Sequence, residues 1–214
     1  LHVSQHSFPT RRSTDLVCLT VETYTARRAY QIAARYRSRG VPVVLGGFHP
    51  TLLPEEAARH ADAVVVGEAE PVWSEVLADA AQGKLRARYE AARPSLDGLR
   101  PDRSIFGQRR YGMVSLVETS RGCRFRCEFC SISAMFRHSC RERPVAEVVE
   151  EVRRLRKPVF FVDDNVGSDP VRLRQLCEAL IPLRRSWIGQ VSLHIAADRE
   201  LLGLMRRSGC EGVL

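Results

Sequence analysis

Short apolar runs alternate with segments of helical periodicity along most of this chain, and this alternation constrains the fold more than any other feature. The apolar runs, which predict buried strands, cover residues 17–21, 41–45, 63–66, 113–117, 159–162, 191–195 and 212–214. The segments with helical spacing cover residues 26–39, 54–60, 71–82, 145–155, 170–183 and 198–207. Because each helix returns the chain to the start of the next strand, the pattern predicts an α/β protein built on parallel sheets.

Residues 84–112 interrupt this alternation and divide it into two parts. The stretch is polar, shows no period, and is punctuated by prolines and glycines, which is typical of a linker. We therefore expect one domain over residues 17–83 and a second over residues 113–214. Because the second domain stops on the first residues of an apolar run, we expect the chain to be a fragment of a longer protein.

The first sixteen residues, LHVSQHSFPTRRSTDL, follow neither period and do not lead into the first apolar run. The string HSFPTRRSTDL resembles translated sequencing-adaptor sequence, which indicates a non-native segment at residues 1–16. A natural disordered tail is the alternative. Under either interpretation we assign these residues no function.

The basic charge balance bears on the choice of partner. A formal net charge of +8 and a pI of about 9.5 would by themselves favour a nucleic-acid partner. Lys84 and Lys157 are the only lysines, however, and the arginines are spread over every segment without interleaved aromatic residues. We therefore expect no nucleic-acid partner. No apolar run approaches the roughly 18 residues that a membrane span needs, so we also expect no transmembrane segment and a cytoplasmic location.

Cysteine usage is the strongest chemical signal in the sequence. Three cysteines fall within one stretch of eight residues and four are scattered; the seven are Cys123, Cys127 and Cys130, then Cys18, Cys140, Cys177 and Cys210. An odd number with one tight cluster favours metal ligation in a reducing compartment over a disulfide framework.

The clustered cysteines have the spacing C-x3-C-x2-C within residues 118–132, ETSRGCRFRCEFCSI, just after a predicted strand. Three thiolates can ligate three irons of a 4Fe-4S cluster and leave the fourth iron open for chemistry. Gly122 allows the sharp departure from the strand that brings the sulfurs together. A structural zinc site with Cys140 as fourth ligand is the alternative, and the spacing and the preceding strand favour the cluster.

This loop resembles the motif of the radical S-adenosylmethionine superfamily, including the aromatic Phe129 before the last cysteine. The resemblance implies that the open iron chelates S-adenosylmethionine and that an electron from the cluster cleaves it to a 5'-deoxyadenosyl radical. It assigns Phe129 to the S-adenosylmethionine site. It also implies that polar residues ending the next strand, VFFVDDN, hold the amino group of that cofactor, so Asp163 and Asp164 are candidates. A turn with a helix cap is the alternative for both carboxylates.

Three polar residues on the following predicted strand, Gln190, Ser192 and His194, alternate along the chain. Alternation of this kind could aim their side chains into a barrel, but an ordinary strand face is the better explanation of the pattern. We therefore leave them outside the predicted site.

Residues 41–85 closely resemble the later half of the cobalamin-binding domain that precedes many radical S-adenosylmethionine domains. Glycines at strand ends let a ligand approach the backbone, and the parallel strand ends open on one crevice. The resemblance implies that cobalamin contacts Thr20, Gly46, Gly47, His49, Gly67 and Glu68. The segment Asp-x-His-x-x-Gly, which supplies a lower axial histidine in some members, is absent from this sequence.

Together the two resemblances cover residues 17–214. They imply a partial Rossmann-like domain followed by a partial (β/α) barrel, and an enzyme that uses a 4Fe-4S cluster, S-adenosylmethionine and cobalamin, with methyl transfer to an unactivated carbon as its reaction. The substrate would be a small or lipid-like molecule and the electron donor a flavodoxin or ferredoxin; we expect the chain by itself to be inactive. A methylthiotransferase-like radical enzyme and a non-enzymatic zinc or nucleic-acid-binding module are the alternatives.

Overall fold

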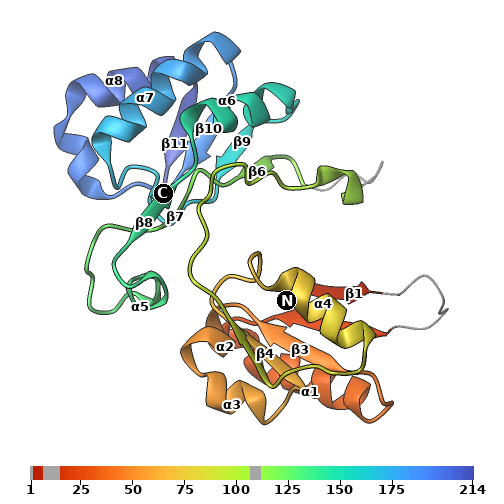
Figure 1. Ribbon diagram of the computed structural model, residues 1–214. Helices are drawn as coiled ribbons and strands as arrows, with labels where there is room; N and C mark the ends of the chain where they lie inside the picture. Colours follow the sequence, from red (N-terminus) through yellow and green to blue (C-terminus); the bar gives the residue numbers. More distant parts are fainter. Residues whose placement is uncertain (1, 7–14, 107–111) are drawn as a thin grey trace. The chain divides into compact units, whose positions relative to one another are not determined.

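The structure, a computed structural model, describes residues 2–6, 15–106 and 112–214 (Figure 1). The chain divides into two compact units, Leu1–Pro94 and Ser95–Leu214. Each unit contains its own sheet and its own hydrophobic core. Within the described ranges, no helix has the length and apolar character needed to cross a membrane.

The first unit is built on a five-stranded sheet in the order β1-β2-β3-β4-β5. Its strands are β1 (His2–His6), β2 (Leu16–Thr20), β3 (Val43–Gly46), β4 (Ala63–Val66) and β5 (Arg88–Glu90). Strands β2 to β5 run parallel and β1 pairs antiparallel with β2. The helices are η1 (Thr23–Thr25), α1 (Ala26–Arg37), α2 (Phe48–Leu52), α3 (Pro54–Ala58) and α4 (Trp73–Ala81).

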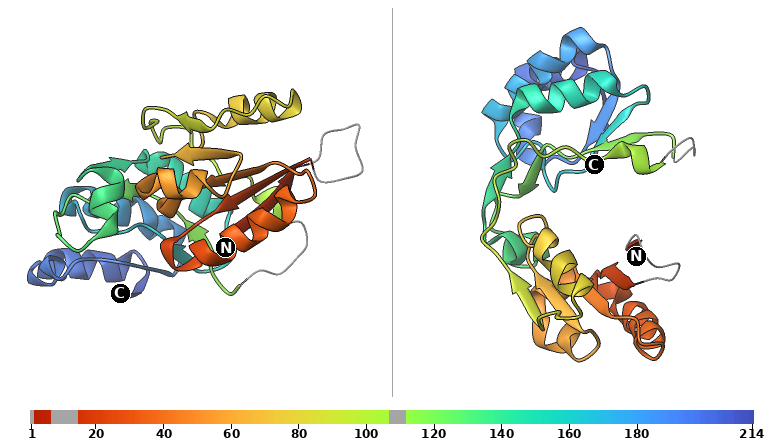
Figure 2. Two further views of the ribbon diagram at one scale, coloured as in Figure 1. Left: turned by 90° about the horizontal axis from the view of Figure 1, so that it is seen from below. Right: turned by 45° about the vertical axis from the view of Figure 1, so that its right-hand side comes forward.

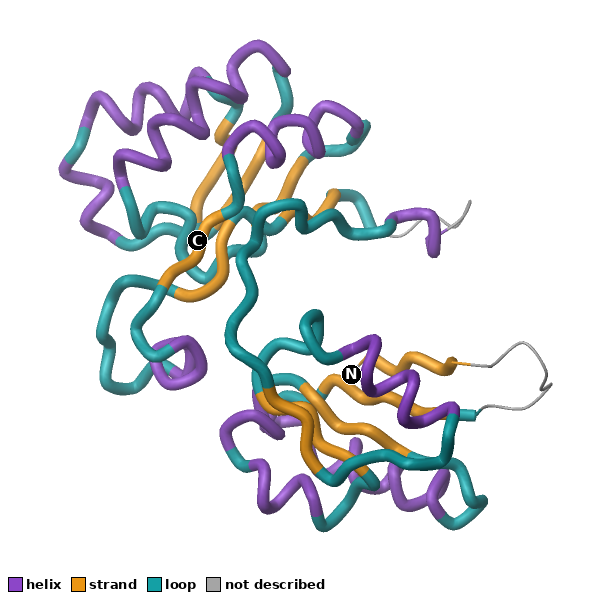
Figure 3. The backbone as a smooth tube through the Cα atoms, in the orientation of Figure 1, coloured by secondary structure: helices purple, strands orange, loops and turns teal. Residues whose placement is uncertain are grey.

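Helices cover both faces of this sheet, as the tube in Figure 3 shows. Small alanines of α1 and α3, such as Ala29 and Ala57, pack on Val17 and Leu45 of one face. Val76 of α4 packs on the opposite face. Because both faces are buried, strands β2, β3 and β4 read as continuous apolar runs, which explains why the sequence predicted them.

The second unit is built on a four-stranded parallel sheet in the order β11-β10-β9-β6, with a separate two-stranded hairpin. Its strands are β6 (Ser115–Val117), β9 (Val159–Phe161), β10 (Trp187–Gly189) and β11 (Cys210–Val213), and the hairpin pairs β7 (Ser120–Gly122) with β8 (Cys140–Glu142). The helices are η2 (Arg103–Phe106), α5 (Ser131–Phe136), α6 (Val145–Arg154), α7 (Pro170–Leu180), η3 (Ile181–Leu183), η4 (Leu193–Ala197) and α8 (Arg199–Arg207).

Helices α6, α7 and α8 lie together on one face of the second sheet (Figures 1 and 2). Val117, Phe161 and Trp187 point from the strands into this core. Leu116 is on the opposite face by strand alternation and is 55% exposed. The sheet is thus covered on one face, as in the wall of a (β/α) barrel, and the predicted α/β class is confirmed for both units.

The expected tail at residues 1–16 differs from the structure in the part that is described. Residues 2–6 form β1, and Leu16 belongs to β2 with its side chain fully buried. The outer edge of β2 carries backbone N–H and C=O groups with which any extended segment can form hydrogen bonds. Strand β1 therefore needs no apolar pattern of its own. The rest of the expected tail, apart from Asp15, lies outside the described residues.

The expected linker at residues 84–112 also contains structure. Strand β5 pairs with β4, and Tyr89 is buried at 2% exposure, so the first unit extends to Pro94. A three-residue strand with one apolar side chain is too short to show a period in the sequence. Gly107, one of the glycines of this stretch, lies outside the described residues.

The strand predicted at residues 191–195 was wrong. The strand is β10, Trp187–Gly189, and most of the predicted range forms the 3-10 helix η4. Gly189 conceals this strand because glycine usually ends one. Here a Cβ at Gly189 would lie 3.4 Å from the Cβ of Phe161 and 3.4 Å from Cγ1 of Val166, so the small residue serves close packing.

Candidate functional site

The three clustered cysteines occupy one loop between β7 and α5. Cys123 directly follows β7, and Cys130 is the N-cap residue of α5. The backbone N–H of Cys130 donates to the carbonyl of Cys127 at 3.1 Å, which turns the loop toward the helix. Cys127 is exposed, and Cys123 and Cys130 are partly buried. The predicted ligands therefore share one short segment at the carboxyl end of the sheet.

The sulfurs of these cysteines do not converge on one point in this structure. Among the described residues, no group of three His, Cys, Asp or Glu side chains could hold a metal ion. The donor set nevertheless fits an iron–sulfur cluster, because all three are free thiols and residues 124–129 are exposed. Few packing contacts would oppose closure of the loop around a cluster.

Cys140, the fourth ligand of the alternative zinc site, is occupied elsewhere. It lies on β8, and its Sγ is 3.8 Å from Oγ of Ser168. Burial raises the pKa of the Cys140 thiol, which disfavours the thiolate that zinc requires. Both observations disfavour Cys140 as a metal ligand.

Asp163, which follows β9, binds the segment that leads into the cysteine loop. Its carboxylate accepts hydrogen bonds from the backbone N–H of Thr119 at 3.0 Å, the Thr119 hydroxyl at 2.8 Å and the Ser120 hydroxyl at 2.5 Å. The side chain is 1% exposed, and burial raises its pKa despite these donors. Asp163 thus anchors the segment between β6 and β7, and its predicted contact with S-adenosylmethionine stays a prediction.

Asp164 and Asn165, the next two residues, contact the residues that come next in the same segment. Asp164 accepts a hydrogen bond from the backbone N–H of Gly122 at 3.2 Å, and burial raises its pKa. The side-chain amide of Asn165 lies 3.9 Å from the Sγ of Cys123. Sequence reasoning missed Asn165, although its position beside the two predicted carboxylates was a usable signal.

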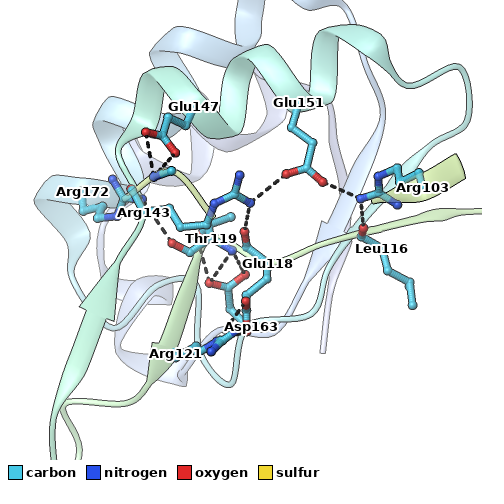
Figure 4. A network of polar contacts seen from close by, with 11 residues as sticks. Arg103, Leu116, Glu118, Thr119, Arg121, Arg143, Glu147, Glu151, Asp163 and Arg172 are labelled. Atoms are coloured by element: carbon cyan, nitrogen blue, oxygen red, sulfur yellow. Dashed lines mark hydrogen bonds and ion pairs between the residues drawn. The ribbon is translucent and has the colours of Figure 1, made fainter. Parts of the chain in front are cut away.

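A buried ion-pair network supports the base of the hairpin (Figure 4). Arg143, which is 2% exposed, donates from Nη1 to the carbonyl of Glu118 at 2.6 Å and to the carboxylate of Glu151 at 2.8 Å. Arg103 donates to the same carboxylate and to the carbonyl of Leu116. The network joins α6 to the end of β6 and to the residue after β8, so it fixes both ends of the segment that carries the cysteines.

Phe129, which the resemblance assigned to the S-adenosylmethionine site, lies at the outer side of the loop. Its side chain is 93% exposed. The ring of Phe125, in the same loop, has its centroid 5.2 Å from that of His194, which lies outside the predicted site. The contact of Phe129 with the cofactor stays a prediction.

The predicted cobalamin residues gather at one edge of the first sheet. Thr20 ends β2 and pairs in register with Gly46, which ends β3. Gly67 and Glu68 follow β4, the next parallel strand, and Gly67 donates its N–H to the Thr51 hydroxyl at 2.9 Å. Because β2, β3 and β4 are parallel neighbours, their carboxyl ends form a common rim.

The backbone conformation at position 47 and its close neighbours require a glycine there, whether or not a ligand binds. Its φ is 98°, and a Cβ there would lie 2.9 Å from the backbone nitrogen of Val21 and 3.0 Å from Cγ2 of Thr20. Gly67 has a φ of 85°, and no atom lies within 4 Å of where its Cβ would be. The space at Gly67 is therefore open to a ligand, whereas the space at Gly47 is filled by the neighbouring strand end.

His49 is held inside the first unit. It is 3% exposed, with Nε2 at 2.8 Å from the Tyr30 hydroxyl and Nδ1 at 3.3 Å from the Thr23 hydroxyl. Burial, together with the hydrogen bond to Glu56, raises the pKa of Tyr30 to about 12. A contact between the His49 side chain and cobalamin would require it to leave these partners, so that contact stays a prediction.

Two protein-family models match this chain. The B12 binding domain model matches residues 10–77, and the Radical SAM superfamily model matches residues 117–213. The first match contains β2, β3 and β4 of the first unit, and the second contains β9, β10 and β11 of the second unit.

Curated relatives match across both units. Bacteriochlorophyllide d C-12(1)-methyltransferase of Chlorobaculum tepidum is 32% identical over 92% of this chain and 46% of its own length. Bacteriochlorophyllide d C-8(2)-methyltransferase of the same organism is 31% identical over 94% of this chain and 49% of its own length. The chain thus spans about half the length of the curated relatives it matches.

A solved structure has a similar fold over its matching half. The radical S-adenosylmethionine methyltransferase TsrM from Kitasatospora setae, with cobalamin and a [4Fe-4S] cluster bound, superposes with a TM-score of 0.73. The alignment covers 94% of this chain and 48% of TsrM at 18% identity. At this identity the likeness establishes the fold.

Proposed function

Because this chain belongs to the radical S-adenosylmethionine superfamily, with a B12-binding domain ahead of its radical region, we propose that the protein acts as a cobalamin-dependent methyltransferase. The observation that carries the proposal is the pairing of the two sites. One unit presents three free cysteines on a single loop, and the other presents the glycine-lined rim of β2, β3 and β4.

The roles of the residues follow from their positions. The cluster would be ligated by Cys123, Cys127 and Cys130. The carboxylates of Asp163 and Asp164 would hold the segment that leads into the cysteine loop and would also contact S-adenosylmethionine. When bound, the cluster and S-adenosylmethionine supply reductive cleavage to a 5'-deoxyadenosyl radical. An external electron donor, such as a flavodoxin or ferredoxin, would supply the electron.

The proposed cobalamin site is the rim of the first sheet. Thr20, Gly46 and Gly67 present small side chains or none at neighbouring strand ends, and a flat ligand can approach the backbone there. A B12-binding domain supports methyl transfer over the methylthio transfer considered from the sequence, because cobalamin carries methyl groups.

The proposed acceptor is a carbon atom of a small organic molecule. Two relatives are named for methylation of bacteriochlorophyllide d, and TsrM has been solved with a tryptophan substrate. These substrates differ in size and polarity, but both are small molecules. They therefore support a small molecule, rather than a protein or nucleic acid, as the class of acceptor.

The test is anaerobic reconstitution with iron and sulfide, followed by metal analysis and electron paramagnetic resonance of the reduced protein. We expect about four irons per chain and a signal that shifts when S-adenosylmethionine is added. Cys127→Ala should abolish the signal, and Cys210→Ala, which lies outside the loop, should keep it. About one zinc per chain with no iron signal would refute the cluster.

Cobalamin binding is measured on the same proteins by retention of hydroxocobalamin after gel filtration. Wild type and Cys127→Ala should retain it equally, since the two sites belong to different units. Failure of both proteins to retain cobalamin would contradict the methyl-transfer proposal while leaving the cluster result intact.

A further inference from the structure

We propose that Asn165 is a positioning residue whose side-chain amide donates a hydrogen bond to the sulfur of Cys123 and thereby raises the reduction potential of the cluster. This inference rests on the cluster of the proposed function. It concerns a contact between this chain's own residues, which the structure places at the carboxyl end of β9.

The orientation of the Asn165 amide is fixed by its partners. The backbone N–H of Gly167 donates to Oδ1 of Asn165 at 3.1 Å, and a backbone N–H can only donate. The oxygen is therefore the atom that faces Gly167, and the nitrogen Nδ2 must face the other way. Nδ2 lies 2.5 Å from the Ser192 hydroxyl and 3.9 Å from the Sγ of Cys123. The two amide hydrogens thus have two acceptors.

Burial makes this arrangement specific. Asn165 is 4% exposed, so no competing solvent surrounds the amide. Asp164 holds the N–H of Gly122, which directly precedes Cys123, and the amide then reaches the sulfur of Cys123 itself. In the part of the chain that the structure describes, neither Cys127 nor Cys130 has a comparable side-chain donor at its sulfur.

The expected consequence follows from charge. A hydrogen bond withdraws electron density from a cysteine thiolate, and hydrogen bonds to the sulfurs are among the factors that set cluster potentials. The reduced cluster carries one more negative charge than the oxidised cluster. A donor therefore stabilises the reduced state more, and its removal should make the midpoint potential more negative.

The hydrogen bond is tested directly in the metal-free full chain. Asn165 is the only asparagine in the sequence, so labelling asparagine side chains with ¹⁵N gives a single amide group in the nuclear magnetic resonance spectrum. Cys123→Ala should shift one of its two proton signals, because the sulfur acceptor is lost. Cys127→Ala, the matched control on the same loop, should leave both signals in place. If neither amide proton signal of Asn165 shifts in Cys123→Ala, the proposal is overturned.

The effect on the cluster is tested by redox titration of the reconstituted protein. Asn165→Leu removes the donor without adding charge, and Asn165→Asp keeps an acceptor for Gly167 but replaces the donor with an oxygen. Both variants should titrate at more negative potentials than wild type. If only Asn165→Asp shifts, its added charge explains the change, and the tuning role of the hydrogen bond is refuted.

The two measurements separate this inference from the proposed function. If wild type assembles no iron–sulfur cluster, the proposed function fails, and the labelled amide still decides whether Asn165 holds Cys123. If the cluster assembles and the amide signal or the potential is unaffected, the proposed function stands and the role of Asn165 falls.

Discussion

Gly122 shows how a single residue shapes the approach to the cysteine loop. Its φ is 88°, and a Cβ there would lie 2.1 Å from the carbonyl oxygen of Ser139 and 3.0 Å from the Cβ of Phe136. The sequence suggested only a sharp turn at this glycine. The structure adds that Ser139, the residue before β8, and Phe136 of α5 occupy the space that a side chain would need.

We expect Gly122→Ala to destabilise the second unit by about 2–5 kcal/mol, since backbone strain and overpacking both contribute. Gly98→Ala is the matched control, because Gly98 has a φ of 73° and no atom within 4 Å of its missing Cβ. It should cost only about 1–2 kcal/mol. Urea unfolding is followed by Trp187 fluorescence in a Trp73→Phe background. Equal losses in the two variants would contradict the close approach at Gly122.

At the scale of elements, α6 joins the parts of the second unit that carry the site. Its apolar face, with Val148 and Val152, packs into the core, and its acidic face supplies Glu151 to Arg143 and Glu147 to the N–H of Gly98. The helical period predicted α6 well, because that period depends on local spacing. The ion pair between Glu151 and Arg143 was not predictable. Arg143 directly follows β8, so its position beside α6 depends on how the hairpin of β7 and β8 folds.

We expect Glu151→Ala to destabilise the second unit by about 3–5 kcal/mol, because Arg143 would be left buried without its counter-ion. Glu150→Ala is the matched control on the same helix. Glu150 pairs with Arg153 and Arg154 near the surface, so its loss should cost less than about 1 kcal/mol. Thermal unfolding measured by circular dichroism compares the two. Similar melting temperatures would argue against a buried pair that matters for stability.

At the scale of the molecule, each unit has its own core, and a buried cysteine in each core reports whether that unit is folded. Cys18 lies in the core of the first unit, and burial raises its pKa to about 12. Cys177 lies in the core of the second unit, and burial raises its pKa to about 11. Both thiols stay protonated and unreactive near neutral pH while their unit is folded. Cys127, by contrast, is exposed to solvent.

We expect Leu45→Ala to increase alkylation of Cys18 in mild urea and leave Cys177 unchanged, because Leu45 is buried in the first unit only. A buried Leu→Ala change costs about 2–5 kcal/mol. Leu201→Ala, in the second unit, should do the reverse. Mass spectrometry after alkylation at pH 7.5 reports each site. Simultaneous labelling of both cysteines in either variant would mean that the units unfold together.

The sequence alone determined the α/β class and the positions of most buried strands and helices, because these depend on local period and on burial of both sheet faces. It also determined the cysteine loop, whose chemistry is contained in one short segment. Only the tertiary structure decided that Asp163 binds Thr119, 44 residues away, and that Tyr30 contacts His49. Such partners depend on which strands become neighbours, since β9 lies beside β6 only once the sheet has formed. The same dependence hid β10 and β5, whose residues are explained by their neighbours in the sheet rather than by any pattern along the chain.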